Sequence, residues 1–218
     1  MLRKTTPLAA LGIALLHAPA AASDDAFEFW INPSVSFGID NDSGVELETA
    51  QRFRSASDGR PDTYFARLWL NQDLSNAVTL SGAVEQRIND GDADETRLIQ
   101  QLSTSHGILR TRLRLEQRFV DGSGRMGLRF RPRLGLSVPL ADESLVSLFG
   151  NAEAFLTLRS TSQGGDDGLT GARTQIGVQY EVSDVLSLSA GYLRQQNIDG
   201  DGPDEVGHAP IIGVEFSF

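Results

Sequence analysis

The feature that most constrains the fold is a strict alternation of two kinds of residue between Leu109 and Phe119. The odd positions are mostly apolar, and the even positions carry charge: Arg110, Arg112, Arg114, Glu116 and Arg118. Successive side chains of a β-strand point to opposite faces of the sheet. The segment therefore predicts a strand with one apolar and one arginine-rich face. After a turn at 121–124 the scheme repeats, with Arg125, Arg129, Arg131 and Arg133 on the charged face.

The same period of two covers most of the remaining chain, and no helical period is sustained. Regular alternation predicts strands at Val78–Ile88, Arg173–Val182, Leu186–Gln196 and Pro210–Phe218. Less regular stretches also predicted as strands are Val45–Arg54, Tyr64–Leu74, Thr96–Thr104 and Leu145–Arg159, and Phe27–Ile39 alternates well too. The chain is therefore expected to be all-β.

The connections between these strands alternate in length. Short turns near 75–76, 105–106, 141–144 and 183–184 alternate with polar loops at 89–95, 161–171 and 199–207 and with a shorter connection at 121–124. Short periplasmic turns and longer extracellular loops are typical of outer-membrane barrels. We predict one antiparallel transmembrane β-barrel of about 10 strands, beginning at Val45. Phe27–Ile39 would be an eleventh segment, whereas both termini in the periplasm require an even number. Either it is an extra piece tucked against or inside the barrel, or another predicted strand is two strands merged, which makes about 12 strands the alternative.

The N-terminus has the organisation of a secretory signal peptide. Arg3 and Lys4 precede an apolar segment from Leu8 to Leu16, and small residues at 20–22 form a cleavage site. We expect residues 1–22 to be removed and residues 23–218 to form the barrel domain. Phe216 and Phe218 end the last alternating strand as a signal for the barrel assembly machinery. These features predict the bacterial outer membrane, with its lipid and lipopolysaccharide as surroundings.

Charge and cysteine content exclude several classes of function. The net charge of −10 argues against nucleic-acid binding, which needs a basic surface. The absence of cysteine excludes disulfides and thiolate metal sites. Lys4 is the only lysine, so every later positive charge is an arginine, whose planar fork suits paired charges.

Short motifs in a fixed order give the chain a family resemblance. They are Trp30, the repeated Glu-Gln-Arg at 85–87 and 116–118, Asn151-Ala152-Glu153 followed by Phe155, the Arg173 strand, Gly191-Tyr192, and His208 before Phe218. In these residues the chain resembles the outer-membrane barrel family called domain of unknown function 2490. The resemblance implies the fold and the location. It implies no activity.

If the apolar face meets lipid, the charged face lines the lumen. The candidate lumen residues are Glu85, Arg87, Arg110, Arg112, Arg114, Glu116, Arg118, Arg129, Arg131, Arg133, Glu153 and Arg173. One interpretation is a lumen filled by arginine–glutamate pairs, in a structural or ligand-binding protein. The alternative is a narrow anion-preferring channel, or a site for a small anionic ligand.

A third hypothesis is a lipid-modifying enzyme of the outer membrane. The predicted topology places His106 at a periplasmic turn and His208 near the extracellular rim, about 25 Å apart across the apolar band. They cannot share a site, so we expect no catalysis. The acidic loop Asp90–Glu95 has Glu95 where a calcium loop needs glycine. We therefore expect solvated loops with no metal site and no cofactor; loose binding of divalent cations by the acidic loops is the alternative.

Overall fold

The computed structural model describes residues 24–54, 62–141, 144–200 and 202–218. The expected signal peptide, residues 1–22, lies outside the described residues. Within them, no helix is long and apolar enough to cross a membrane.

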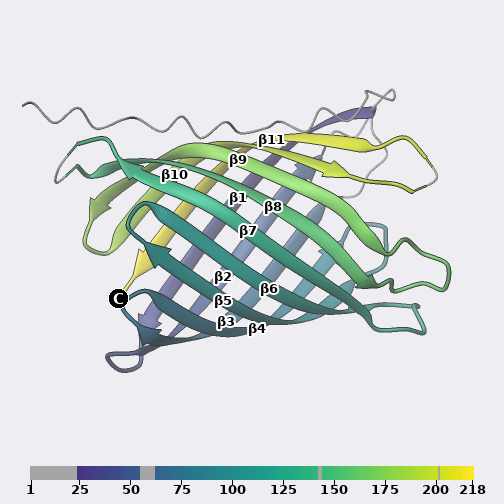
Figure 1. The fold of residues 1–218 in the computed structure, drawn as a ribbon, viewed down its shortest axis with the longest axis horizontal. Coiled ribbons are helices and arrows are strands. Elements are labelled where there is room, and N and C mark those ends of the chain that lie inside the picture. The colour runs from purple at the N-terminus through teal and green to yellow at the C-terminus, as the bar shows by residue number, and fades with distance from the viewer. Residues whose placement is uncertain (1–23, 55–61, 142–143, 201) are drawn as a thin grey trace, which may run out of the picture.

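Within the described residues, eleven strands form a single closed barrel. Figure 1 shows the barrel from the side. They are β1 (Asp24–Gly38), β2 (Ser43–Arg54), β3 (Thr63–Ser75), β4 (Val78–Asn89), β5 (Glu95–His106), β6 (Leu109–Val120), β7 (Gly127–Pro139), β8 (Val146–Arg159), β9 (Gly168–Ser183), β10 (Leu186–Asn197) and β11 (Glu205–Ser217). Each strand is hydrogen-bonded to the next in sequence, and β1 closes the circle against β11. The predicted all-β barrel is confirmed.

The strand number differs from the expected ten or twelve, because β1 and β11 run parallel. Ile31 pairs with Ile212 and Val35 with Phe216, whereas every other neighbouring pair of strands is antiparallel. The expectation of an even number assumed antiparallel closure throughout, which the parallel pair removes. Phe27–Ile39 is thus an integral wall strand, apart from its last residue, and is not an extra piece tucked against the barrel.

Most connections are shorter at one end of the barrel than at the other, although connection 140–145, at the shorter end, spans six residues. We call the end with connections 39–42, 76–77, 107–108 and 184–185 the turn end. The opposite, loop end carries the longer connections 90–94, 121–126 and 160–167. The tight turn at 107–108 has φ 58° at Gly107, a conformation that glycine adopts without steric cost. In the 39–42 turn, the Asp42 backbone N–H donates to the Asp40 carboxylate (2.9 Å) and lowers the pKa of that carboxyl.

The two faces of the wall have opposite chemistry. In β3, Phe65, Arg67 and Trp69 are buried, whereas the alternate residues Leu68 and Leu70 are about 60% and 58% exposed. Strands β4 to β8 repeat this division, with buried arginines and glutamates inside and exposed aliphatic and aromatic side chains outside. A barrel that faced water would bury its apolar residues, so this distribution is inverted relative to a soluble protein.

Candidate functional site: the arginine–glutamate lumen

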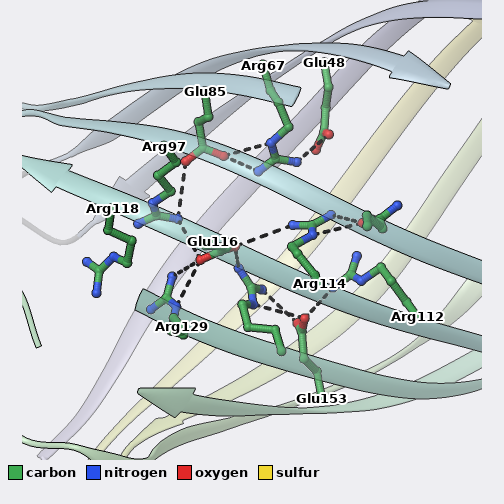
Figure 2. Close-up of polar contacts among 12 residues, drawn as sticks. Glu48, Arg67, Glu85, Arg97, Arg112, Arg114, Glu116, Arg118, Arg129 and Glu153 are labelled. Atoms are coloured by element: carbon green, nitrogen blue, oxygen red, sulfur yellow. Dashed lines mark hydrogen bonds and ion pairs between the residues drawn. The ribbon is translucent and has the colours of Figure 1, made fainter. Parts of the chain in front are cut away.

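One charged residue from each of eight consecutive strands forms a chain of contacts around the lumen. We call it the charge ladder, and Figure 2 shows much of it. From β2 to β9 its members alternate in sign: Glu48, Arg67, Glu85, Arg97, Glu116, Arg131, Glu153 and Arg173. Arginine and glutamate thus alternate from strand to strand, and each member of the ladder lies next to a residue of opposite charge.

The first part of the ladder follows directly from strand register. Glu48 pairs with Arg67, Arg67 with Glu85, and Glu85 with Arg97 as opposite residues of neighbouring strands. Opposite residues on one face of an antiparallel pair have Cβ atoms about 5 Å apart, which suits ion pairs. The Arg67 guanidinium accordingly reaches both Glu48 (2.6 Å) and the Glu85 carboxylate.

The two carboxylates at the centre are fully buried. Glu85 accepts hydrogen bonds from Arg67 and Arg87, and Arg97 lies 3.3 Å away. Glu116 accepts from Arg129 (2.7 Å) and Arg131 (2.6 Å). Removing a carboxylate from water costs several kcal/mol unless partners replace the lost hydration. Each of these glutamates gains such partners from neighbouring strands.

Glu153 joins the far part of the ladder. Arg131 donates to both of its oxygens through Nε (3.1 Å) and Nη2 (2.9 Å), in the bidentate geometry that favours arginine over lysine. Arg112 also donates to Glu153. Arg173, directly opposite Glu153 in register, lies 4.0 Å from it.

The sector of the lumen formed by β10, β11 and β1 contains a small apolar cluster. Leu193, Ala209 and Trp30 pack there as a buried cluster. Two arginine guanidinium groups lie over the Trp30 ring, that of Arg52 at 3.9 Å and that of Arg173 at 5.0 Å from its centroid. The Trp30 indole N–H donates to Glu28 (2.6 Å). The aromatic ring thus holds two cations where the ladder ends.

Two cavities lie inside the barrel, one on each side of a layer of arginine side chains. The larger, about 170 Å³, extends toward the turn end, where Asn151 and Gln175 line it. The second, about 110 Å³, extends toward the loop end, where Thr170 and Asn197 line it. Both are lined by Arg52, Arg87, Arg131 and Arg173, so the layer that these arginines form lies between the two cavities.

The structure places most of the sequence-predicted lumen residues in or beside the ladder. Those buried are Glu85, Arg87, Arg112, Arg114, Glu116, Arg131 and Glu153, and those partly buried are Arg118, Arg129, Arg133 and Arg173. Arg110 lies at the start of β6, where it is exposed and donates to the carbonyl oxygen of Gly107. The predicted assembly signal is exposed at the turn end, where Phe218 stacks on Phe37 (5.4 Å) and on Phe216 (6.5 Å).

Sequence reasoning missed several members of the lumen. They are Glu28, Glu48, Arg52, Arg67, Glu95 and Arg97. In β2 the signal was present, since Glu46, Glu48 and Arg52 occupy alternate positions, but Thr49 and Gln51 obscure the apolar face. Glu95, considered above as part of an acidic loop, begins β5 and binds Arg97 and Arg118, each at 2.5 Å.

The fold and the lumen define a class of protein: a closed β-barrel with an apolar exterior and an interior of paired arginines and glutamates. The chain belongs to the family described as protein of unknown function (DUF2490), which it matches over residues 27–206. It is also similar to an uncharacterised protein of Methylorubrum extorquens, with 26% identity over 208 residues that cover 89% of this chain and 90% of that protein. The family resemblance inferred from the sequence is thereby confirmed.

Proposed function

We propose that this protein is an outer-membrane β-barrel with a structural role, whose lumen is closed by the charge ladder. The observation that carries the proposal is the inverted polarity of the wall. Large apolar side chains such as Leu68 (60% exposed) and Ile176 (66% exposed) cover the outside, while Glu85 and Glu116 are fully buried inside.

Lipid accounts for this distribution where water does not. In a hydrocarbon core each backbone polar group needs a partner within the protein, and a closed barrel meets that requirement. Every strand here has two hydrogen-bonded neighbours. The proposed surroundings are outer-membrane lipid and lipopolysaccharide, and the barrel assembly machinery is the proposed partner that recognises Phe216 and Phe218.

The packing of the lumen favours a closed barrel over an anion channel. Barrels of about eight strands have interiors that side chains just fill, whereas aqueous porin channels have about sixteen. Here the side chains of the ladder project into the interior and pair with one another. Glu116, for example, accepts hydrogen bonds from two arginines of the next strand at 2.6 and 2.7 Å. An ion crossing the layer would have to break such pairs.

The positions of the histidines favour a non-enzymatic protein. His106 ends β5 at the turn end, and His208 lies near the start of β11, at the loop end. The Nδ1 atom of His208 forms a hydrogen bond with the Tyr192 hydroxyl (2.6 Å). The two histidines are thus held apart by the length of the barrel.

Two measurements test the proposal. Protein folded in detergent, verified by a heat-dependent shift in gel mobility, should insert into liposomes and resist extraction with carbonate. A chain that stays soluble and folded without detergent would contradict the membrane location.

The second measurement is single-channel conductance in planar bilayers. We expect no discrete steps from the verified folded barrel. Anion-preferring steps that disappear in the Arg112→Ser/Arg131→Ser double variant would contradict closure and establish the channel instead. Arg125→Ser, which removes an exposed loop arginine, is the matched control.

A further inference from the structure

The loop-end cavity is lined by arginines without a lining carboxylate. Six arginines line it: Arg52, Arg87, Arg97, Arg129, Arg131 and Arg173. Within the described residues no aspartate or glutamate lines it, although the turn-end cavity includes Glu48 and Glu153. The surface of this cavity is therefore strongly positive.

The six arginines differ in how far glutamates neutralise them. Arg97, Arg129 and Arg131 each lie within 3.3 Å of a glutamate oxygen, and Arg87 lies 3.1 Å from Glu85. The ion pair of Arg173 is longer than these, since its guanidinium lies 4.0 Å from the carboxylate of Glu153. Arg52 forms no ion pair with any residue that the structure describes. The excess positive charge thus gathers at Arg52 and Arg173.

Arg52 is buried as well as unpaired. The residue is only 9% exposed, and its Nε–H has no hydrogen-bond acceptor within the described chain. A buried donor left without an acceptor destabilises the folded protein, because its lost hydration is not replaced. The Trp30 ring offsets part of the cost of burying the cation, because its face attracts positive charge, but it accepts no proton and leaves the charge in place.

The surrounding contacts orient the second cation. Gln195 accepts from Arg173 through its side-chain oxygen, with Nε at 3.1 Å, and its amide donates to Asn197 (2.9 Å). The Arg173 guanidinium is therefore held over Trp30, beside the same cavity that Arg52 lines. Two guanidinium groups directed at one space suit an oxyanion, whose oxygens accept paired N–H groups.

We propose that the loop-end cavity is a binding site for a small phosphate-type oxyanion, held principally by Arg52 and Arg173. The volume of about 110 Å³ exceeds the roughly 10–15 Å³ that one water needs, which suits an ion of phosphate size. A free phosphate and a phosphate on a lipid headgroup share this chemistry. The closed, hydrogen-bonded wall leaves no opening between strands for a lipid chain, which favours the free ion. The site concerns the lumen alone and does not depend on the proposed location.

Trp30 provides the readout, because the chain has only two tryptophans. In the Trp69→Phe variant, Trp30 is the sole reporter and lies in contact with both proposed ligand-binding arginines. Inorganic phosphate is titrated into the folded detergent-solubilised barrel at constant ionic strength, maintained with chloride. We expect a saturable change in Trp30 emission as the anion draws Arg52 from the indole face.

Matched arginine variants test the assignment. Arg52→Gln should weaken phosphate binding at least tenfold, and Arg173→Gln should also weaken it. Arg125→Gln removes the same charge from an exposed loop and should leave binding unchanged. Because Arg52→Gln also alters the fluorophore's surroundings, equilibrium dialysis with radiolabelled phosphate provides an independent measure. The Arg52→Gln barrel must first show the heat-dependent mobility shift of the folded protein.

Three outcomes would overturn the proposal. One is the absence of saturable phosphate binding in both measurements on the folded wild-type barrel. Another is equal binding by Arg52→Gln and Arg125→Gln. The third is a response to dispersed short-chain phosphatidic acid with none to inorganic phosphate, which would assign the arginines to a lipid headgroup.

Discussion

Glu116 and Arg131 form a buried ion pair, 2.6 Å from Oε1 to Nη1, although they do not face each other in strand register. Glu116 lies opposite Arg129, and Arg131 lies opposite Arg114. The long arginine side chain reaches diagonally, a separation of about 7–8 Å between backbones that such side chains can span. Glu116 therefore binds Arg129 through Oε2 and Arg131 through Oε1. This diagonal contact carries the ladder from β6 to β7.

Loss of the Glu116 charge should destabilise the barrel strongly. Glu116→Gln leaves Arg129 and Arg131 buried with one ionic partner removed from each. Breaking a buried pair in this way typically costs about 3–5 kcal/mol. We expect a corresponding fall in the free energy of unfolding, measured by urea titration in detergent. Asp121→Asn, in an exposed loop, is the control, and an equal loss in both variants would contradict a special role for Glu116.

The contributions of Glu116 and Arg131 should be non-additive. Substituting both with glutamine is expected to destabilise less than the sum of the single changes, since either one already breaks the contact. Coupling between contacting residues is commonly about 0.5–3 kcal/mol. The measurement is a double-mutant cycle in urea. Glu116→Gln combined with Asp121→Asn should be additive, and additivity in the first cycle would show that the pair does not act as a unit.

Parallel closure of the barrel can be tested by cross-linking, since the chain has no native cysteine. Ile31→Cys and Ile212→Cys introduce thiols at paired positions of β1 and β11 and should form a disulfide under mild oxidation. The result is read as a mobility change on a non-reducing gel. Ile31→Cys with Phe216→Cys places the thiols four residues out of register, about 13 Å apart. Efficient cross-linking of that second pair alone would contradict the parallel register.

A close approach of β9 and β10 predicts an intolerant glycine. A Cβ at Gly177 would lie 2.5 Å from both the Ala190 carbonyl oxygen and the Phe149 ring. Gly177→Ala should therefore lower the free energy of unfolding by about 1–3 kcal/mol through overpacking. At Gly82 the nearest atom to a new Cβ is 4.0 Å away, so Gly82→Ala should be close to neutral. Equal effects would argue against close packing at Gly177.

The terminal aromatic predicts an assembly defect, if the proposed membrane location holds. Phe218→Ala removes the ring that stacks on Phe37 and Phe216 at the turn end. We expect less folded, heat-modifiable barrel in cell envelopes and little change for protein refolded in detergent. Phe27→Ala, an exposed aromatic near the loop end, is the control. A Phe218→Ala barrel that assembles normally in cells would contradict the signal.

Strand alternation proved most informative where the apolar and charged residues are strictly separated. In β6 the sequence places Arg112, Arg114 and Glu116 on one face, and all three are buried inside the barrel. In β5 the same rule applies to Glu95 and Arg97, but polar Thr96 and Gln100 on the outer face weakened the pattern. The partner of each charge could not be read from alternation, because alternation gives the face of a residue and not its register.

The sequence by itself determined that the chain forms a sheet with an apolar face and a charged face. Both properties depend on the local period of two, which each strand carries independently. Only the tertiary structure decided that the barrel closes by parallel pairing of β1 with β11, and that Arg52, over Trp30, has no carboxylate partner among the described residues. The first relationship depends on the register between the first and last strands of the chain. Trp30 and Arg52 face each other across the β1–β2 hairpin, but which carboxylates come near Arg52 depends on the other strands that the closed barrel brings around it.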